Sequence, residues 1–241
     1  DLRRRAAEPA RQVSRDAGAR GNGRVVVIGG GVMGAAIACF LARDHGVGVT
    51  VVERDPSFAR ASSALSASSI RQQFSQPVNI ALSRWSVGFL RRIGDELAVG
   101  GERPSIGLVE PGYLMLATPA GEPVLRANHA LQTAAGARIA LLDATALQAR
   151  YPWLATEGLA LGALGLDGEG WFDGPALHQA LRRKALACGA RWLAAEAAGF
   201  DTEADRVVAV RGAEGTRLDG DAFVIAAGAW SALLAAALGV A

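Results

Sequence analysis

Short apolar runs alternate with helical patterns near both ends of the chain. A continuous β-branched run, Val25–Ile28, ends at three glycines and is followed by apolar residues at helical spacing over 32–42. A second apolar run, residues 47–52, closes on Glu53. Runs without polar alternation are typical of strands covered on both faces. The pattern therefore predicts strand, helix and strand within about thirty residues, the size of a parallel βαβ unit.

The next part of the chain follows another pattern. Residues 61–69 are mostly serine and alanine, which favours a loop beside a ligand over a core element. A helix is expected from Pro77, with one apolar face between Ile80 and Ile93. The elements expected after it show no strand–helix–strand rhythm: strands at 113–116 and 158–166, and helices at 120–136 and 143–150.

The alternation of helices and apolar strands resumes at residue 171. Asp173 can cap a helix that has Pro175 in its first turn and stops at Gly189. After that helix we expect the strands 191–197, 207–210 and 222–225, a turn at 199–201 and a last helix at 229–239. The pattern therefore predicts an α/β domain of the nucleotide-binding type, interrupted by a middle insertion.

Composition narrows the class of protein. The 241 residues are 51% hydrophobic and 20% charged with a net charge of +2, which excludes a disordered chain and gives no reason to expect nucleic acid as a partner. Cys39 and Cys188 lie far apart and form no disulfide framework or metal motif. We expect no bound metal.

An uncharged apolar run at residues 223–241 is long enough to be a membrane-span candidate. It contains a strand-like segment followed by Gly228, it is half alanine and glycine, and no basic residues flank its exit. We therefore expect no membrane span. Residues 1–23, rich in arginine and without an apolar core, are expected to form a mobile tail.

The glycines after the first strand form the pattern Gly29-x-Gly31-x-x-Gly34, and Glu53 ends the next strand nineteen residues later. In a dinucleotide site the first glycine permits the tight turn, the second lets the backbone approach a pyrophosphate, and the third lets helix and strand pack closely. The acid would accept the ribose hydroxyls, which disfavours a 2′-phosphate. The motif predicts FAD or NAD rather than NADP.

Beyond this motif, the sequence resembles the DAO-type FAD-dependent oxidoreductases, a family that includes glycine oxidase and sarcosine oxidase. The resemblance spans about residues 24–241 and is carried by residues 26–34, 52–54, 61–63, 171–173 and 226–231. Within this family, the sequence is most similar to a subgroup, the FAD-dependent oxidoreductase domain-containing proteins. The residues that carry this similarity are 69–75, Pro77, Asn79, 169–173 and 181–184.

The resemblance implies a Rossmann-like FAD-binding domain with a glutathione-reductase-type βαβ unit and a parallel sheet, interrupted by a partial α+β substrate domain. The FAD-binding domain would comprise residues 24–76 and 168–241, and the substrate domain would include residues 77–167. Members of this family bind FAD in an extended form, with the flavin ring between the two domains. The residues implied to bind FAD are Gly29, Gly31, Val32, Met33, Gly34, Glu53, Arg54, Ser62, Ser63, Ala67, Ser68, Ser69, Ala197, Ala226, Ala227 and Gly228. For the serine run, a flexible linker is the alternative.

The same resemblance implies a role for Arg71, which matches an arginine that holds the substrate carboxylate in sarcosine oxidase-like enzymes. A guanidinium suits that task because it is a planar fork that stays charged. The alternative is a surface arginine at a helix end. Family members that attach FAD covalently have a histidine where this chain has Leu65, so we expect non-covalent FAD. His45, His129 and His178 are expected to be structural or exposed.

These observations favour an FAD-dependent oxidoreductase that oxidises the C–N bond of an amino acid or N-methylated amine by hydride transfer to the flavin. An NAD-dependent dehydrogenase and a flavoprotein-like assembly or binding module without turnover are the alternatives. The chain stops before the family's later segment, so we expect it to be incomplete and to need that segment or a partner chain. The expected compartment is the cytoplasm, or the mitochondrion in a eukaryote.

Overall fold

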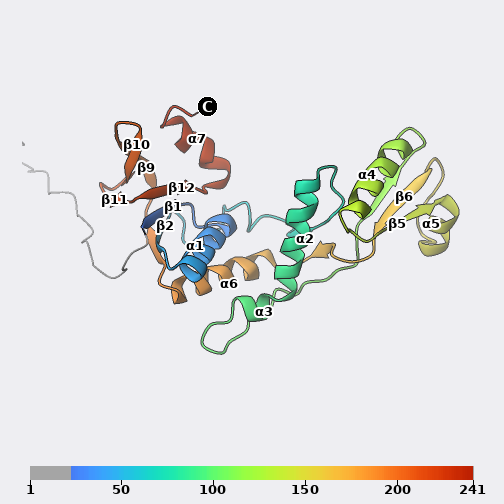
Figure 1. The fold of residues 1–241 in the computed structure, drawn as a ribbon, viewed down its shortest axis with the longest axis horizontal. Coiled ribbons are helices and arrows are strands. Elements are labelled where there is room, and N and C mark those ends of the chain that lie inside the picture. Colours follow the sequence, from blue (N-terminus) through green and yellow to red (C-terminus); the bar gives the residue numbers. More distant parts are fainter. Residues whose placement is uncertain (1–22, 241) are drawn as a thin grey trace, which may run out of the picture. The chain divides into compact units, whose positions relative to one another are not determined.

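The computed structural model describes residues 23–240, which form two compact units (Figure 1). Unit 1 contains residues 23–66, 99–101 and 175–240, and unit 2 contains residues 67–98 and 102–174. Of the tail expected at residues 1–23, residues 1–22 lie outside the described part.

Unit 1 is built on a four-stranded parallel sheet in the order β12-β1-β2-β8. The apolar run after residue 24 forms its centre because a strand flanked by two others and covered on both faces has no polar side to present. Val27, fully buried, pairs with Val51 on one side and Val224 on the other. The strands are β1 (Arg24–Ile28), β2 (Gly48–Glu53), β8 (Arg191–Ala194) and β12 (Ala222–Ile225).

Helix α1 (Val32–His45) connects β1 to β2, as the sequence predicts. The residues that it buries are small, namely Gly34, Ala35, Ala38, Cys39 and Ala42, so the helix axis can lie close to the sheet. The helix ends at Gly46, whose φ of 60° places it in the left-handed region that favours glycine. Helix α6 (Gly174–Ala187) leads into β8 of the same sheet.

A second, antiparallel sheet in unit 1 has the order β11-β10-β9, with β9 (Ala197–Glu203), β10 (Arg206–Gly212) and β11 (Arg217–Asp219). The prediction of a turn at 199–201 was wrong, because these residues lie inside β9. Phe200 is 8% exposed and packs in one cluster with Val26 and Val210, so burial of an aromatic side chain outweighs the turn propensity of its glycine and aspartate neighbours.

The apolar run at the C-terminal end is divided into β12, the 3₁₀ helix η1 (Gly228–Trp230) and helix α7 (Ser231–Ala236). Helix α7 is shorter than the expected helix at 229–239. Among residues 23–240, no helix has the length and apolar character needed to cross a bilayer.

Unit 2 contains a three-stranded antiparallel sheet in the order β4-β6-β5. Strand β5 (Ile139–Asp143) was not expected from the sequence. It lies between two helices, and Ile139 packs with Ile80 and Ala163 in the core of the unit. The other elements are α2 (Pro77–Arg91), α3 (Ile93–Glu96), β4 (Leu114–Ala117), α4 (Glu122–Ala134), α5 (Ala144–Arg150), β6 (Leu161–Gly165) and the short antiparallel pair β3 (Ser69–Ile70) and β7 (Gly170–Trp171).

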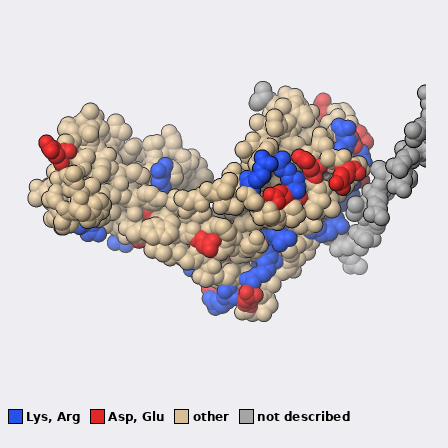
Figure 2. All heavy atoms as spheres, turned by 180° about the vertical axis from the view of Figure 1, so that it is seen from behind, with Lys and Arg blue, Asp and Glu red and all other residues tan. Residues whose placement is uncertain are grey.

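Acidic and basic side chains lie beside one another on the face drawn in Figure 2. Ion pairs of unit 1 include Asp201 of β9 with Arg211 of β10 at 3.0 Å and Arg217 with Asp219 at 3.0 Å. Exposed pairs of this kind contribute little to stability, but they leave the surface charge locally balanced.

Candidate cofactor site

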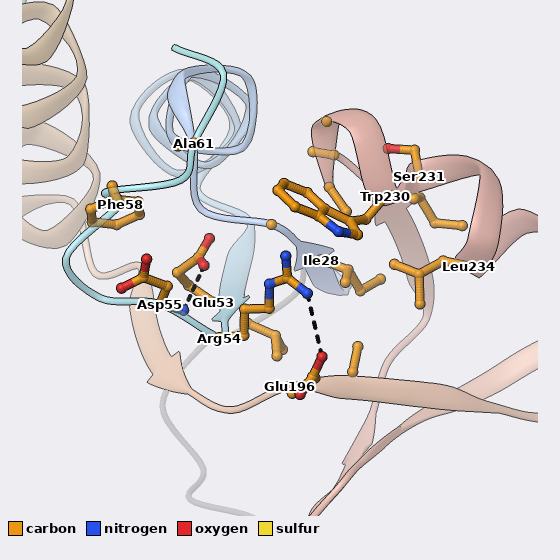
Figure 3. Close-up of a pocket in the computed structure, with 18 of the residues that line it drawn as sticks. Ile28, Glu53, Arg54, Asp55, Phe58, Ala61, Glu196, Trp230, Ser231 and Leu234 are labelled. Atoms are coloured by element: carbon orange, nitrogen blue, oxygen red, sulfur yellow. Dashed lines mark hydrogen bonds and ion pairs between the residues drawn. The ribbon is translucent and has the colours of Figure 1, made fainter. Parts of the chain in front are cut away.

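A cavity of about 1180 Å³ opens in unit 1 at the carboxyl end of its parallel sheet (Figure 3). The last residues of all four strands line it, namely Ile28, Glu53, Ala194 and Ile225. Ligands of open α/β sheets bind at this edge, because the loops that follow parallel strands converge there. The topology therefore places a binding site where the glycine loop lies.

The three glycines of the fingerprint differ in what surrounds them. Gly29 has a φ of 101°, and a Cβ there would lie 2.4 Å from the Ala226 carbonyl oxygen. A Cβ at Gly34 would lie 1.9 Å from the carbonyl oxygen of Gly29. At Gly31 the nearest atom is Ser63 Oγ at 3.7 Å, and Gly31 lines the cavity. Gly29 and Gly34 are thus required by the protein's own packing, whereas the space beside Gly31 is open to a ligand.

The Glu53 carboxylate binds two loops, the glycine loop after β1 and the loop that follows β2. Its Oε2 accepts a hydrogen bond from the Gly30 N–H at 2.7 Å, and its Oε1 accepts one from the Asp55 N–H at 2.8 Å. Each carboxylate oxygen can accept a second hydrogen bond, so the residue can hold the loop and a ribose hydroxyl together. Glu53 lines the cavity beside the glycine loop.

The serine loop contributes two of the predicted residues to this cavity. Ser63 Oγ accepts a hydrogen bond from the Val32 N–H, in the first turn of α1, at 3.4 Å. A Cβ added at Gly228, whose φ is 56°, would lie 3.7 Å from Ser62 Oγ. The two serines therefore lie between the N-terminus of α1 and the turn after β12.

Trp230 is a cavity residue to which the sequence had assigned no role. The Arg54 guanidinium lies 4.1 Å from the centre of its ring and that of Arg60 lies 5.6 Å away, both within the range of cation–π attraction. Arg54 also pairs with Glu196 at 3.4 Å, as Figure 3 shows. The tryptophan lies two residues after the Ala226–Gly228 turn, which is the local signal that could have identified it.

The cavity brings together most of the residues predicted to bind a cofactor. Lining it are Gly29, Gly31, Val32, Met33, Glu53, Arg54, Ser62, Ser63, Ala197, Ala226, Ala227 and Gly228. Gly34 lies beneath the loop, where it is buried against Gly29. The remaining predicted residues, Ala67, Ser68, Ser69 and Arg71, belong to unit 2 and do not line the cavity. The binding role of each of these residues stays a prediction.

Arg71 is exposed at the end of β3 in unit 2, and its guanidinium lies 5.0 Å from the ring centre of Phe74. Its backbone is held in place, since Ser83 Oγ donates a hydrogen bond to the Arg71 carbonyl oxygen. The residues that follow it, Gln72 and Gln73, are buried and bind the carboxylate of Glu169. A fixed backbone with an exposed guanidinium is suited to binding an anion.

The three histidines differ in their surroundings. His45 is exposed at the end of α1, and His129 lies in a hydrogen bond of 3.0 Å with the Ile139 carbonyl oxygen. His178 is 5% exposed, and burial lowers its pKa below 6.5. Its Nε2 lies 2.7 Å from the carbonyl oxygen of Gly30, in the glycine loop.

Comparison with known proteins gives this site a context. Residues 24–241 match the family model described as DAO, FAD dependent oxidoreductase. The chain is 38% identical to FAD-dependent oxidoreductase domain-containing protein 1 of Xenopus laevis over 239 residues, which cover 90% of this chain and 48% of that protein. It is 35% identical to glycine oxidase of Geobacillus kaustophilus over 224 residues, covering 90% of this chain and 57% of the relative. The chain thus spans about half the length of these curated relatives.

Solved structures show the same fold. The crystal structure of L-proline dehydrogenase from P. horikoshii superposes with a TM-score of 0.78 at 26% identity, covering 91% of this chain and 56% of the other. That of glycine oxidase from G. kaustophilus has a TM-score of 0.74 at 29% identity, covering 91% and 60%. Residues 24–241, which the family model matches, include the glycine loop, Glu53 and the parallel sheet. The chain belongs to the DAO family of FAD-dependent oxidoreductases.

Proposed function

We propose that this chain binds FAD in the cavity of unit 1 and forms part of an enzyme that oxidises the C–N bond of an amino acid or N-methylated amine. The observation that carries the proposal is the open side of Gly31 at the carboxyl ends of four parallel strands. The relatives named glycine oxidase and L-proline dehydrogenase support the substrate class.

The residues around the cavity fit the ADP half of FAD. The N-terminus of α1 and the unobstructed backbone of Gly31 suit a pyrophosphate, because helix N-termini bind anions through their N–H groups and dipole. Glu53 suits the ribose hydroxyls. The cavity volume of about 1180 Å³ is above the range of about 300–1,000 Å³ typical of ligand pockets, which suits an extended dinucleotide.

FAD, when bound, supplies the acceptor for the hydride that leaves the carbon of the C–N bond. The chain's own residues then have to bind and orient the amine. Arg71 is our candidate for the substrate carboxylate, since a guanidinium offers two parallel N–H donors to a carboxylate. The rigid backbone of residues 71–73, held by Glu169 and Ser83, would keep that fork in one place.

The two relatives that support the substrate class are named for the amino acids glycine and L-proline. This chain covers 48% and 57% of the two curated relatives, and residues from a further segment or from a partner chain belong to the proposal for the complete site. The compartment, cytoplasm or mitochondrion, is a further part of the same proposal.

The test is spectroscopic. The purified protein, which includes the further segment or partner chain proposed above, is mixed with FAD, freed of excess FAD by gel filtration and scanned for the flavin bands in the visible range. It is then mixed without oxygen with glycine, sarcosine or proline. Loss of the flavin absorbance on adding one of these amines is the expected result, and Arg71→Ala should raise the amine concentration needed at least about tenfold, the lower range for a lost charge-assisted hydrogen-bond pair.

Two other outcomes have different meanings. Retained flavin that no amine reduces would support the alternative of a binding module without turnover. Protein that retains no flavin would contradict the proposed function altogether. Arg71→Lys, which keeps the charge and loses the fork, serves as the matched variant and should recover only part of the amine affinity.

A further inference from the structure

Gly30, the residue inside the glycine fingerprint to which the motif assigns no role, is held on every side. Its N–H donates to Glu53 Oε2 at 2.7 Å, and its carbonyl oxygen lies 2.7 Å from His178 Nε2. A Cβ added there would lie 2.8 Å from Trp192 Nε1. Glu53 and His178 therefore hold the two peptide groups of this buried glycine, and Trp192 closes the side on which a side chain would lie.

His178 must be the donor in its contact with Gly30, because a carbonyl oxygen can only accept a hydrogen bond. Its ring belongs to α6, is 5% exposed, and meets the ring of Phe58 edge to face, with centroids 4.4 Å apart. Burial and the nearby Arg182 guanidinium lower the pKa of His178, and the Gly30 carbonyl and Glu53 oppose them. The imidazole is thus a neutral donor held in one orientation.

The hydrogen bond to Gly30 also determines where the next N–H points. In a trans peptide the carbonyl and the N–H of the following residue point in opposite directions, and the described residues contain no cis peptide bond. Anchoring the Gly30 oxygen on His178 therefore directs the Gly31 N–H away from α6. Gly31 lines the cavity and is the N-cap of α1, so this N–H belongs to the group that would meet a phosphate.

We propose that His178 is a positioning residue that sets the affinity of this chain for the pyrophosphate of the dinucleotide, by fixing the plane of the Gly30–Gly31 peptide. The inference rests on the proposed binding of FAD to the cavity. It goes beyond the fingerprint, because the residue comes from a helix 148 positions away in the sequence.

The test compares three ligands: FAD, ADP and adenosine, of which adenosine has no phosphate. In His178→Leu the donor is lost while an apolar side chain fills the space. We expect the dissociation constants of FAD and ADP to rise about tenfold, the value of one lost hydrogen bond to a buried acceptor, and that of adenosine to stay unchanged. His178→Gln, which can again donate an N–H, should recover part of the affinity. Isothermal titration calorimetry gives all three constants.

His129→Leu is the matched control. His129 contacts a carbonyl oxygen as well, that of Ile139 at 3.0 Å, but it lies in unit 2. Loss of this contact should lower thermal stability and leave all three dissociation constants unchanged. Circular dichroism verifies that each variant is folded at the temperature of the titration.

The outcomes separate the two proposals. Unchanged FAD and ADP binding in folded His178→Leu would overturn the positioning role alone, and so would equal losses for adenosine and ADP, which a general loosening of the cavity would cause. Wild-type protein with no affinity for FAD or ADP would overturn the proposed function and the inference with it.

Discussion

The buried carboxylate of Glu169 accepts a hydrogen bond from the backbone N–H of Gln72 at 2.7 Å. The same oxygen, Oε1, accepts from the Gln73 N–H at 3.0 Å, while Oε2 accepts from the Gln73 side chain at 3.0 Å and the Tyr113 N–H at 3.1 Å. Glu169 is 0% exposed, so these four donors replace the water that a carboxylate requires. They join residues far apart in the sequence within unit 2.

Glu169→Gln should destabilise unit 2. The substitution puts an amide N–H₂ where one oxygen faces N–H donors, so at least one pair of donors meets another donor. We expect the free energy of unfolding to fall by about 3 kcal/mol, the range for buried charge-assisted hydrogen bonds. Urea unfolding followed by fluorescence measures it. Glu157→Gln, at an exposed position of the same unit, is the control, and an equal effect of both variants would contradict the prediction.

Gly31→Leu and Gly34→Ala should separate binding from folding. Gly31 has open space beside it and a φ of −61°, so a side chain there fits the protein but obstructs the phosphates. We expect Gly31→Leu to lose FAD retention while its free energy of unfolding changes by less than about 1 kcal/mol. In Gly34→Ala the added methyl group meets the Gly29 backbone. This variant should lower the free energy of unfolding by about 3 kcal/mol, as overpacked positions do. The two measurements are flavin absorbance after gel filtration and the melting temperature. A Gly31→Leu protein that retains stoichiometric flavin would refute the assignment.

Cys39 should resist alkylation in the folded protein. It is 0% exposed on the buried face of α1, and burial raises the pKa of its thiol from 9.0 to about 11, so the reactive thiolate is scarce at pH 8. Iodoacetamide followed by peptide mass spectrometry should label the half-buried Cys188 first and Cys39 only in urea. Equal labelling of both in native protein would be inconsistent with this burial.

The same thiol adds a pH dependence to stability. Because the folded-state pKa of Cys39 lies above its unfolded value, its contribution is complete below pH 9 and is lost as the pH rises toward 11. Cys39→Ser has a hydroxyl that does not titrate in this range. The difference in melting temperature between wild type and Cys39→Ser should therefore shrink between pH 8.5 and 10.5; a constant difference would argue against the shift.

Bound FAD should be released by acid. The resemblance implies a histidine in the serine loop of covalent family members, where this chain has the exposed Leu65, a side chain without a nucleophilic atom. After precipitation of the holoprotein with trichloroacetic acid, all flavin fluorescence is expected in the supernatant. Fluorescence that stays with the washed pellet would show a covalent link through another residue.

The βαβ unit could be predicted from the sequence because its signals are local. A continuous apolar run, three glycines and a helical spacing of small residues each report the backbone conformation of their own segment. Glu53 was found in the same way, from its place at the end of a strand. Local signals failed at residues 199–201, where the turn propensity of glycine and aspartate was outweighed by the burial of Phe200.

What the sequence by itself determined was therefore the glycine loop, its strands and helix, and the acid that ends the second strand. Only the tertiary structure decided which side chains complete the loop: His178 and Trp192 reach Gly30 from α6 and β8, and Trp230 reaches Arg54 from the turn after β12. The reason is physical. A segment's periodicity reflects which of its faces is buried, whereas the partner of a polar atom depends on distant segments that meet only when the sheet has formed.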